Sequence, residues 1–69
     1  MLSANVSVLW RVEQANGRTA SARLVPNGDK AELIWYSGGE VVGSEEFDDL
    51  ASAMNRAEEL RLLVKIGGF

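Results

Sequence analysis

Apolar residues recur at helical spacing in one long stretch of the chain, from Asp48 to Lys65. At 100° of rotation per residue, its apolar side chains fall within one arc of roughly 120°. These side chains are Leu50, Ala53, Met54, Ala57, Leu60 and Val64. Polar residues such as Ser52, Asn55 and Glu59 lie on the opposite side. The pattern predicts an amphipathic helix, and because a helix this short is marginal alone in water, it must pack on the residues before it.

The ends of this predicted helix carry capping signals. Asp48 is expected to be the N-cap, and Asp49 places negative charge where the helix dipole favours it. At the other end, Lys65 lies in the last turn and Gly67 can adopt the left-handed conformation that closes a helix. Arg61 falls on the apolar arc, where its stem is expected to cover the core while the guanidinium reaches water or an acidic neighbour. A ligand-binding arginine is the alternative.

Apolar and polar residues alternate from Val6 to about Gln14, which is the pattern of a half-buried strand. One side carries Val8, Trp10 and Val12, and the other carries Ser7, Leu9, Arg11 and Glu13. We expect the side with Trp10 to face the core.

The Asn16-Gly17 pair predicts a hairpin after this strand, and the register depends on the loop length. A two-residue loop would place Trp10 opposite Arg23, whereas a three-residue loop, residues 15–17, places apolar residues opposite each other. The longer loop pairs Val8 with Leu24, Trp10 with Ala22 and Val12 with Ala20. We therefore expect the three-residue loop, with Gly17 in a left-handed bulge position.

The second strand is expected over residues 18–25, and Pro26-Asn27-Gly28-Asp29 predicts a surface turn after it. The third strand, residues 31–36, has two distinct faces. One face carries Ala31, Leu33 and Trp35, and the other carries Glu32, Ile34 and Tyr36. Because Glu32 favours water, the face with Trp35 is expected to be the core face.

Ser37-Gly38-Gly39-Glu40 predicts a second tight hairpin, because two glycines can take the positive φ of a primed turn. The resulting register pairs Trp35 with Val42, Tyr36 with Val41, Ile34 with Gly43 and Glu32 with Glu45. The last pair is unfavourable because the charges are alike. The alternation of Phe47 also disagrees with that of Val42. Both observations predict a β-bulge between Gly43 and Phe47.

These elements predict an α+β fold. It is a two-layer sandwich in which a four-stranded antiparallel meander is followed by one C-terminal helix packed on one face. The expected organisation is a loose leader over residues 1–5, a single domain over residues 6–66 and a tail over residues 67–69. The expected core consists of Val8, Trp10, Val12, Leu24, Leu33, Trp35, Val42, Phe47, Leu50, Met54, Ala57, Leu60 and Val64.

The length allows only one small core, because 69 residues form a single domain. Such domains usually add disulfides, a metal or a partner subunit. The sequence has no cysteine and no histidine, so oligomerisation is the expected route. The first residues lack the basic start and apolar run of a signal peptide, and no stretch has the roughly 18 apolar residues of a membrane span. We expect a cytoplasmic protein with no membrane partner.

Catalysis has little support in the sequence. Without histidine or cysteine, the usual pairs of nucleophile and base are absent, and zinc would depend on carboxylates alone. Strand alternation points Glu45 and Glu46 to opposite sides, and capping explains Asp48 and Asp49. This acidic run also lacks the spacing of a calcium-binding EF-hand loop. We expect no enzyme, no catalytic residue, no cofactor and no metal.

One helix covers only one face of a four-stranded sheet, so the other face is expected to be open. That face has an apolar and aromatic centre with a charged rim, a composition typical of a contact surface. Its candidate interaction residues are Leu9, Arg11, Arg23, Ile34, Tyr36 and Val41. We expect a homodimer or another protein as the partner. The other interpretation is an antiparallel sheet with one face in water and scattered apolar residues on it.

A nucleic-acid-contacting sheet is the alternative function, with Arg11, Arg23 and Tyr36 acting as basic and aromatic residues do on other sheet faces. Nucleic-acid binders usually carry a basic stripe. This chain instead has seven basic and ten acidic residues, for a net charge of −3. Nucleic acid is therefore the less expected partner.

One part of the chain resembles a known class of domain. The run Ser44-Glu45-Glu46-Phe47-Asp48-Asp49, followed by Ala53 and by Arg56-Ala57-Glu58-Glu59-Leu60-Arg61, resembles small uncharacterised bacterial domains. In those domains a short antiparallel sheet ends in a phenylalanine and an acidic cap before an alanine-rich helix. The resemblance covers about a quarter of the chain. It implies a bacterial protein and assigns no functional residue.

Overall fold

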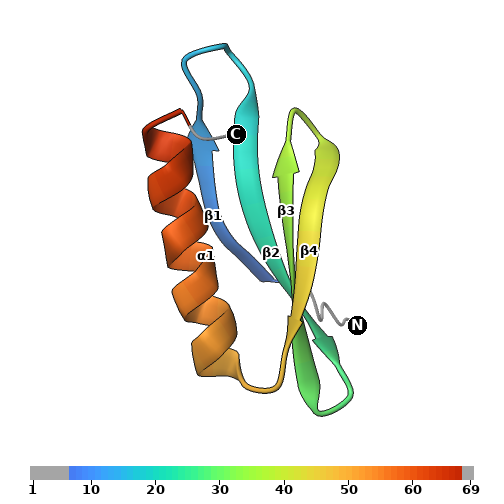
Figure 1. The fold of residues 1–69 in the computed structure, drawn as a ribbon. Coiled ribbons are helices and arrows are strands. Elements are labelled where there is room, and N and C mark those ends of the chain that lie inside the picture. Colours follow the sequence, from blue (N-terminus) through green and yellow to red (C-terminus); the bar gives the residue numbers. More distant parts are fainter. Residues whose placement is uncertain (1–6, 68–69) are drawn as a thin grey trace.

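The chain folds into one antiparallel sheet followed by one helix (Figure 1). The computed structural model describes residues 7–67. The elements are β1 (Ser7–Glu13), β2 (Thr19–Asn27), β3 (Lys30–Ser37), β4 (Glu40–Phe47) and α1 (Leu50–Lys65). The strands are hydrogen-bonded in the order β1-β2-β3-β4, so the predicted meander and α+β architecture are confirmed. The predicted leader, residues 1–5, and the last two residues of the predicted tail lie outside the described residues.

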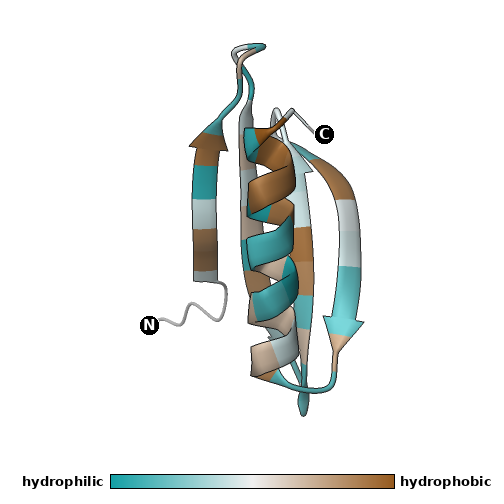
Figure 2. Cartoon of the chain, turned by 60° about the vertical axis from the view of Figure 1, so that its left-hand side comes forward, coloured by the Kyte–Doolittle hydropathy of each residue, from teal (hydrophilic) through white to brown (hydrophobic). Residues whose placement is uncertain are grey.

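The helix and the sheet form two layers of unequal width. In Figure 2, α1 lies across the middle of one sheet face, with β1 and β4 on either side of it. All four strands contact α1. The molecule measures 36 × 27 × 15 Å, and the smallest dimension has room for only one sheet and one helix. In the part of the chain that the structure describes, the second sheet face therefore has no covering layer.

The first hairpin has the predicted three-residue loop. The Gln14 amide donates to the Arg18 carbonyl at 2.7 Å, and the Gly17 amide donates to the Gln14 carbonyl at 3.0 Å. Gly17 has φ +85, the left-handed conformation that this loop requires. The register across the hairpin pairs Trp10 with Ala22 and Val12 with Ala20. Both pairs were predicted from the preference for apolar against apolar residues, and both are confirmed.

A β-bulge at Leu9 changes which residues of β1 face the helix. The ladder pairs Ser7 with Leu24, Val8 with Arg23 and Trp10 with Ala22. Leu9 is thus an extra residue, and the predicted pairing of Val8 with Leu24 is wrong. Val8 lies on the open face and is 49% exposed, whereas Leu9 packs against the core. The bulge exchanges these two residues because one inserted residue reverses the alternation of everything before it.

The two later turns are both two-residue turns. Gly28, with φ +65, begins the turn between Asn27 and Lys30, and Pro26 and Asn27 are the last residues of β2 instead of turn residues. In the next hairpin Ser37 pairs with Glu40, and the two glycines between them have φ +62 and +86. Positive φ at both positions is the signature of the predicted primed turn, which is confirmed.

A second β-bulge, at Val42, shifts the pairing of β3 with β4. Tyr36 pairs with Val41 as predicted, but Trp35 pairs with Gly43. The bulge therefore comes earlier in β4 than the predicted position between Gly43 and Phe47. It brings Gly43, which has no side chain, under the indole ring of Trp35. It also turns Phe47 toward the core, which explains the change of alternation in the sequence.

The core is small and rich in alanine. Its buried side chains are Ala20, Ala22, Ala31, Leu33, Ala53, Ala57, Leu60 and Val64, and the largest fully buried one is Leu33. Around them pack the partly buried side chains of Leu9, Trp10, Trp35 and Phe47. The indole of Trp10 donates a hydrogen bond to the Ala57 carbonyl at 2.9 Å, which fixes α1 to β1. Alanines in both layers let the helix approach the sheet closely, so this core buries little apolar surface.

Four predicted core residues are exposed: Val8, Val42, Leu50 and Met54. The bulges account for the two valines, since each lies at or beside an inserted residue. On α1 the small side chains of Ala53 and Ala57 face the sheet directly. Leu50, 58% exposed, and Met54, 45% exposed, lie at the margin of that face, so the predicted apolar arc is wider than the buried one.

The helix begins one residue later than its predicted cap. Asp49 is the N-cap, and its carboxylate accepts the Ser52 amide at 2.7 Å, so the prediction of Asp48 is wrong. That hydrogen bond lowers the pKa of Asp49 below its ordinary value. At the other end, Ile66 is the C-cap, and Gly67 has φ +82 and donates to the Val64 carbonyl at 3.0 Å, as predicted.

Candidate functional site

The open sheet face brings together most of the predicted interaction residues. Because Ala22 and Leu33 point toward α1, the alternating residues of the same strands point to the opposite face. The residues on that face that were predicted are Arg11, Arg23, Ile34, Tyr36 and Val41. Leu9 is not among them, because the bulge turns it toward the helix. Val8 takes its place on the open face, opposite Arg23.

Arg23 and Tyr36 form the centre of this open face. The guanidinium carbon of Arg23 lies 4.8 Å from the centroid of the Tyr36 ring, a cation–π arrangement. Ile34 pairs with Arg23 across β2 and β3, and Val41 pairs with Tyr36 across β3 and β4. Together they give four adjacent side chains on three strands, with apolar and aromatic surface at the middle.

One end of the open face is charged. Glu32 pairs with Glu46, so a like-charge pair is present, although the predicted partner was Glu45. Two neighbours offset the repulsion: the Asn27 side-chain amide donates to the Glu46 carboxylate at 2.8 Å, and the Lys30 ammonium lies 3.9 Å from it. The same Lys30 nitrogen lies 3.5 Å from the Asp48 carboxylate. This cluster forms a polar rim beside the apolar centre.

Sequence alternation missed Val8 as a member of the open face. Val8 lies on the open face because of the bulge at Leu9, and the sequence there has no glycine or proline that would have indicated a bulge. The bulge in β4 did leave a signal, since the disagreement between Val42 and Phe47 predicted an inserted residue. The position of the inserted residue could be found only from the structure, in which Gly43 lies against the Trp35 ring.

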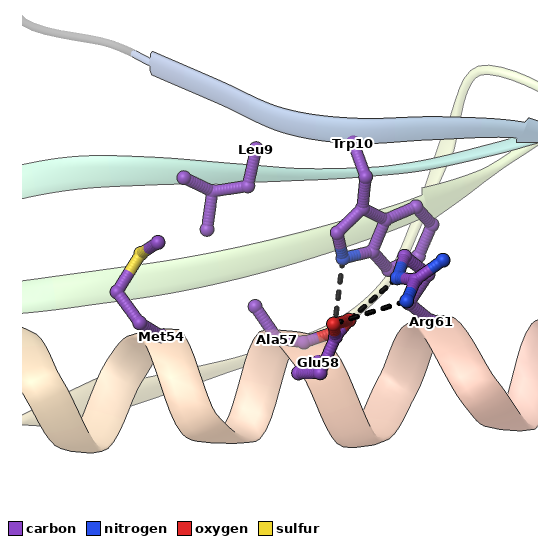
Figure 3. Close-up of a pocket in the computed structure, with 6 residues that line it drawn as sticks. All are labelled: Leu9, Trp10, Met54, Ala57, Glu58 and Arg61. Carbon is purple, nitrogen blue, oxygen red and sulfur yellow. Dashed lines mark hydrogen bonds and ion pairs between the residues drawn. The ribbon is translucent and has the colours of Figure 1, made fainter.

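A hollow of about 210 Å³ lies between β1 and α1 (Figure 3). It is lined by Leu9, Trp10, Met54, Ala57, Glu58 and Arg61. One side is apolar and the other carries an ion pair, in which a terminal guanidinium nitrogen of Arg61 lies 3.0 Å from the Glu58 carboxylate. Arg61 lowers the pKa of Glu58 through this hydrogen bond. Arg61 thus reaches an acidic neighbour, as its place on the apolar arc predicted.

The outer side of α1 near its end carries a second apolar surface. Leu62, Leu63 and Ile66 are exposed there, and Ile66 is 80% exposed. Figure 2 shows the last turns of the helix largely in brown. An open hollow of about 620 Å³ borders these side chains, with Arg56, Glu59 and Lys65 at its rim. The predicted helix had no apolar side there, because these residues fall outside the arc that faces the core.

Within residues 7–67, no group of three or more acidic, histidine or cysteine side chains is placed to hold a metal ion. In the same residues, no helix has the length and the apolar character needed to cross a membrane.

No protein-family model, curated protein or solved structure matches this chain.

Proposed function

We propose that this protein is a non-catalytic interaction module that associates with a second copy of itself through the open sheet face. One observation carries the proposal. Ile34, Tyr36 and Val41 form an apolar and aromatic centre on a face that no described element covers. Contact surfaces combine such a centre with a polar rim.

The thin core supports association. Among residues 7–67, five of the eight buried side chains are alanines, and Leu33 is the largest that is fully buried. A single core in a domain of this size supplies only a few kcal/mol of stability. Burial of the open face against a partner would add apolar area that the helix alone does not supply.

The size of the face also supports a partner protein. The two larger dimensions of the molecule are 36 and 27 Å, and the sheet is one of its two layers. A face of this extent is comparable to the roughly 800 Å² that each partner buries in a standard protein–protein interface. The rim also carries both signs of charge, and Arg11 of one copy can pair with Glu13 or Glu32 of the other across a two-fold axis.

Two features favour a protein partner over nucleic acid. Arg23 already covers the ring of Tyr36, which a stacked base would need. Glu32 and Glu46 place negative charge on the same face, where phosphates would be repelled. The nucleic-acid alternative would require Arg11 and Arg23 to outweigh both.

The location of the protein belongs to the same proposal. A cysteine-free sequence is compatible with a reducing compartment, and we propose that the module works in the bacterial cytoplasm.

Sedimentation velocity of the purified chain at tens of micromolar tests the proposal. We expect a dimer for the natural sequence and a monomer for Tyr36→Glu and Ile34→Glu, with unchanged circular dichroism. Asn55→Glu is the matched control, because it adds the same charge to an exposed position on α1 and should leave the dimer intact.

Two results would change the conclusion. A monomer at every concentration would overturn self-association and leave another protein as the partner of the open face. Salt-dependent binding of single-stranded RNA, lost in Arg11→Ala and Arg23→Ala, would favour the nucleic-acid alternative.

A further inference from the structure

The outer side of β1 is a free edge of the sheet in the described residues. In an antiparallel ladder, successive residues point their backbone groups alternately toward and away from the neighbouring strand. The Gln14 amide donates across the hairpin to the Arg18 carbonyl, and Val12 forms the next pair that points inward. Because Gln14 and Val12 point their backbone groups toward β2, the amides and carbonyls of Glu13 and Arg11, which alternate with them, point away from β2. They are the donors and acceptors that an added strand would satisfy.

Two hollows lie along this edge, between β1 and α1. The first, about 210 Å³, is lined on its apolar side by Leu9 and Met54 (Figure 3). The second, about 360 Å³, lies further along β1, beside Val12, and is bordered by Asn16 and by Lys65 of the last helical turn. Side chains two residues apart on a strand are separated by roughly 6.6 Å on one face. Alternate side chains of one added strand could therefore enter both hollows.

The opposite edge of the sheet is different. Glu40, Glu45 and Glu46 give β4 three like charges and the strand has no basic residue, whereas β1 carries one charge of each sign, and like charges along an edge discourage the addition of a strand. On that side of the helix, Arg56 lies 3.4 Å from Glu45 and links α1 to β4. No ion pair in the described residues links α1 to β1 in this way. Both hollows of the groove lie on the β1 side of the helix.

We propose that β1 and α1 form a groove for an extended segment of another protein, which pairs with the β1 edge as a fifth strand. A large apolar side chain of that segment enters the hollow beside Leu9 and Met54. A polar side chain further along the segment enters the hollow near Asn16 and Lys65. Main-chain hydrogen bonds supply affinity in this mode of recognition, and the hollows supply sequence preference.

The dimensions of the groove favour a peptide segment over other occupants. The hollow beside Leu9, about 210 Å³, is smaller than the roughly 300–1,000 Å³ of sites for drug-sized ligands and suits one side chain. The hollow of about 360 Å³ beside Val12 is only at the lower end of that range. A second copy of β1 fits less well. The antiparallel register that pairs Arg11 with Glu13 of the second copy places Gln14 of that copy opposite Trp10, so no large apolar side chain reaches the hollow.

Nuclear magnetic resonance with short model peptides tests the proposal. The peptides are threonine-rich, and one central guest position carries leucine, phenylalanine, alanine or aspartate. At millimolar concentration we expect the leucine and phenylalanine peptides to shift the amide resonances of Arg11 and Glu13 and the methyl resonance of Met54. Their affinity should exceed that of the aspartate peptide at least about tenfold, because burial of the guest side chain is favourable only when it is apolar.

Two variants separate the backbone contribution from the side-chain contribution. Arg11→Pro removes one outward amide without removing a bond to β2, and should weaken binding at least about fivefold, whereas Arg11→Ala keeps the amide and should bind normally. Met54→Glu places a charge in the hollow and should weaken binding of the leucine peptide about tenfold, with Asn55→Glu as the control.

Several results would overturn the proposal. One is the absence of shifts in β1 with all four peptides. Others are equal affinity for the leucine and aspartate peptides, and peptide-induced shifts confined to Ile34 and Tyr36 on the open face. If Arg11→Pro fails to fold, the Met54→Glu comparison decides alone. Because Met54 does not belong to the open face, failure of the Met54→Glu comparison leaves the proposed dimer untouched, and failure of the Tyr36→Glu and Ile34→Glu tests leaves the proposed groove untouched.

Discussion

Because Gly43 lies against the ring of Trp35, we expect Gly43→Ala to destabilise the protein, although replacing a strand glycine by alanine is usually stabilising. Glycine in a strand interior normally destabilises a protein by roughly 0.5–1 kcal/mol relative to alanine, so Gly43→Ala would ordinarily stabilise the sheet. Gly43 also has no positive φ that an alanine would find strained. The cost of the substitution must therefore come from the ring above it.

The structure gives the size of that cost. A Cβ atom at Gly43 would lie 2.6 Å from Cζ2 and 2.9 Å from Cε2 of Trp35. Unstrained carbon atoms approach to about 3.5–4.0 Å, so the ring must move by about 1 Å. The ring packs against the core cluster, and displacing it is a form of overpacking that costs about 1–3 kcal/mol. We expect a net loss of about 1 kcal/mol for Gly43→Ala, after the gain in strand propensity.

Urea denaturation followed by tryptophan fluorescence measures this loss, and the melting temperature should fall by roughly 4–8 °C. Ser44→Ala, at the next position of β4, is the control for strand propensity. In a Trp35→Leu background the clash should largely disappear and the gain in strand propensity should remain, so a double-mutant cycle should give a coupling of about 1.5–2 kcal/mol. A Gly43→Ala protein as stable as the natural one would show that the ring does not lie over Gly43.

Three further predictions concern the core and the helix. Leu33→Ala removes the largest fully buried side chain and should cost about 2–5 kcal/mol, enough to leave much of the chain unfolded at 25 °C by circular dichroism. Trp10→Phe removes the hydrogen bond to the Ala57 carbonyl, and urea denaturation should show a free energy of unfolding lower by about 0.5–1.5 kcal/mol. An unchanged free energy of unfolding would argue against that hydrogen bond. Because the Ser52 amide lowers the pKa of Asp49 below its ordinary 3.8, the ionised cap stabilises the helix above that pH, and stability should fall as the pH drops through the folded-state pKa. Thermal melts between neutral and acidic pH should show a smaller pH dependence in Asp49→Asn.

The arrangement of elements follows from signals that are local in the sequence. Asn16-Gly17 and Gly38-Gly39 determine two turns, and the apolar pairing of Trp10 with Ala22 selects the loop length between alternatives. The helical spacing of apolar residues after Phe47 determines the last element. Because each signal acts over a few residues, the strand order and the helix could be predicted without the structure.

The sheet face to which each side chain points depends on β-bulges, which the alternation of apolar and polar residues does not reveal. The bulge at Leu9 exchanges Val8 and Leu9 between the two faces, and the one at Val42 moves Gly43 under Trp35. Each bulge is a compromise between strand pairing and packing on the helix, so it depends on contacts between distant segments. The same holds for the groove beside β1, whose hollow exists because Leu9 faces α1.

The proposed dimer requires the open sheet face of one copy to cover that of the other in solution. Isotope-filtered nuclear Overhauser spectroscopy on an equal mixture of labelled and unlabelled chains tests this contact directly. We predict intermolecular signals from the Tyr36 ring and the Ile34 and Val41 methyl groups of one copy to the same face of the other. Intermolecular signals confined to Leu62, Leu63 and Ile66 on α1, with none from Tyr36, would contradict the proposed interface.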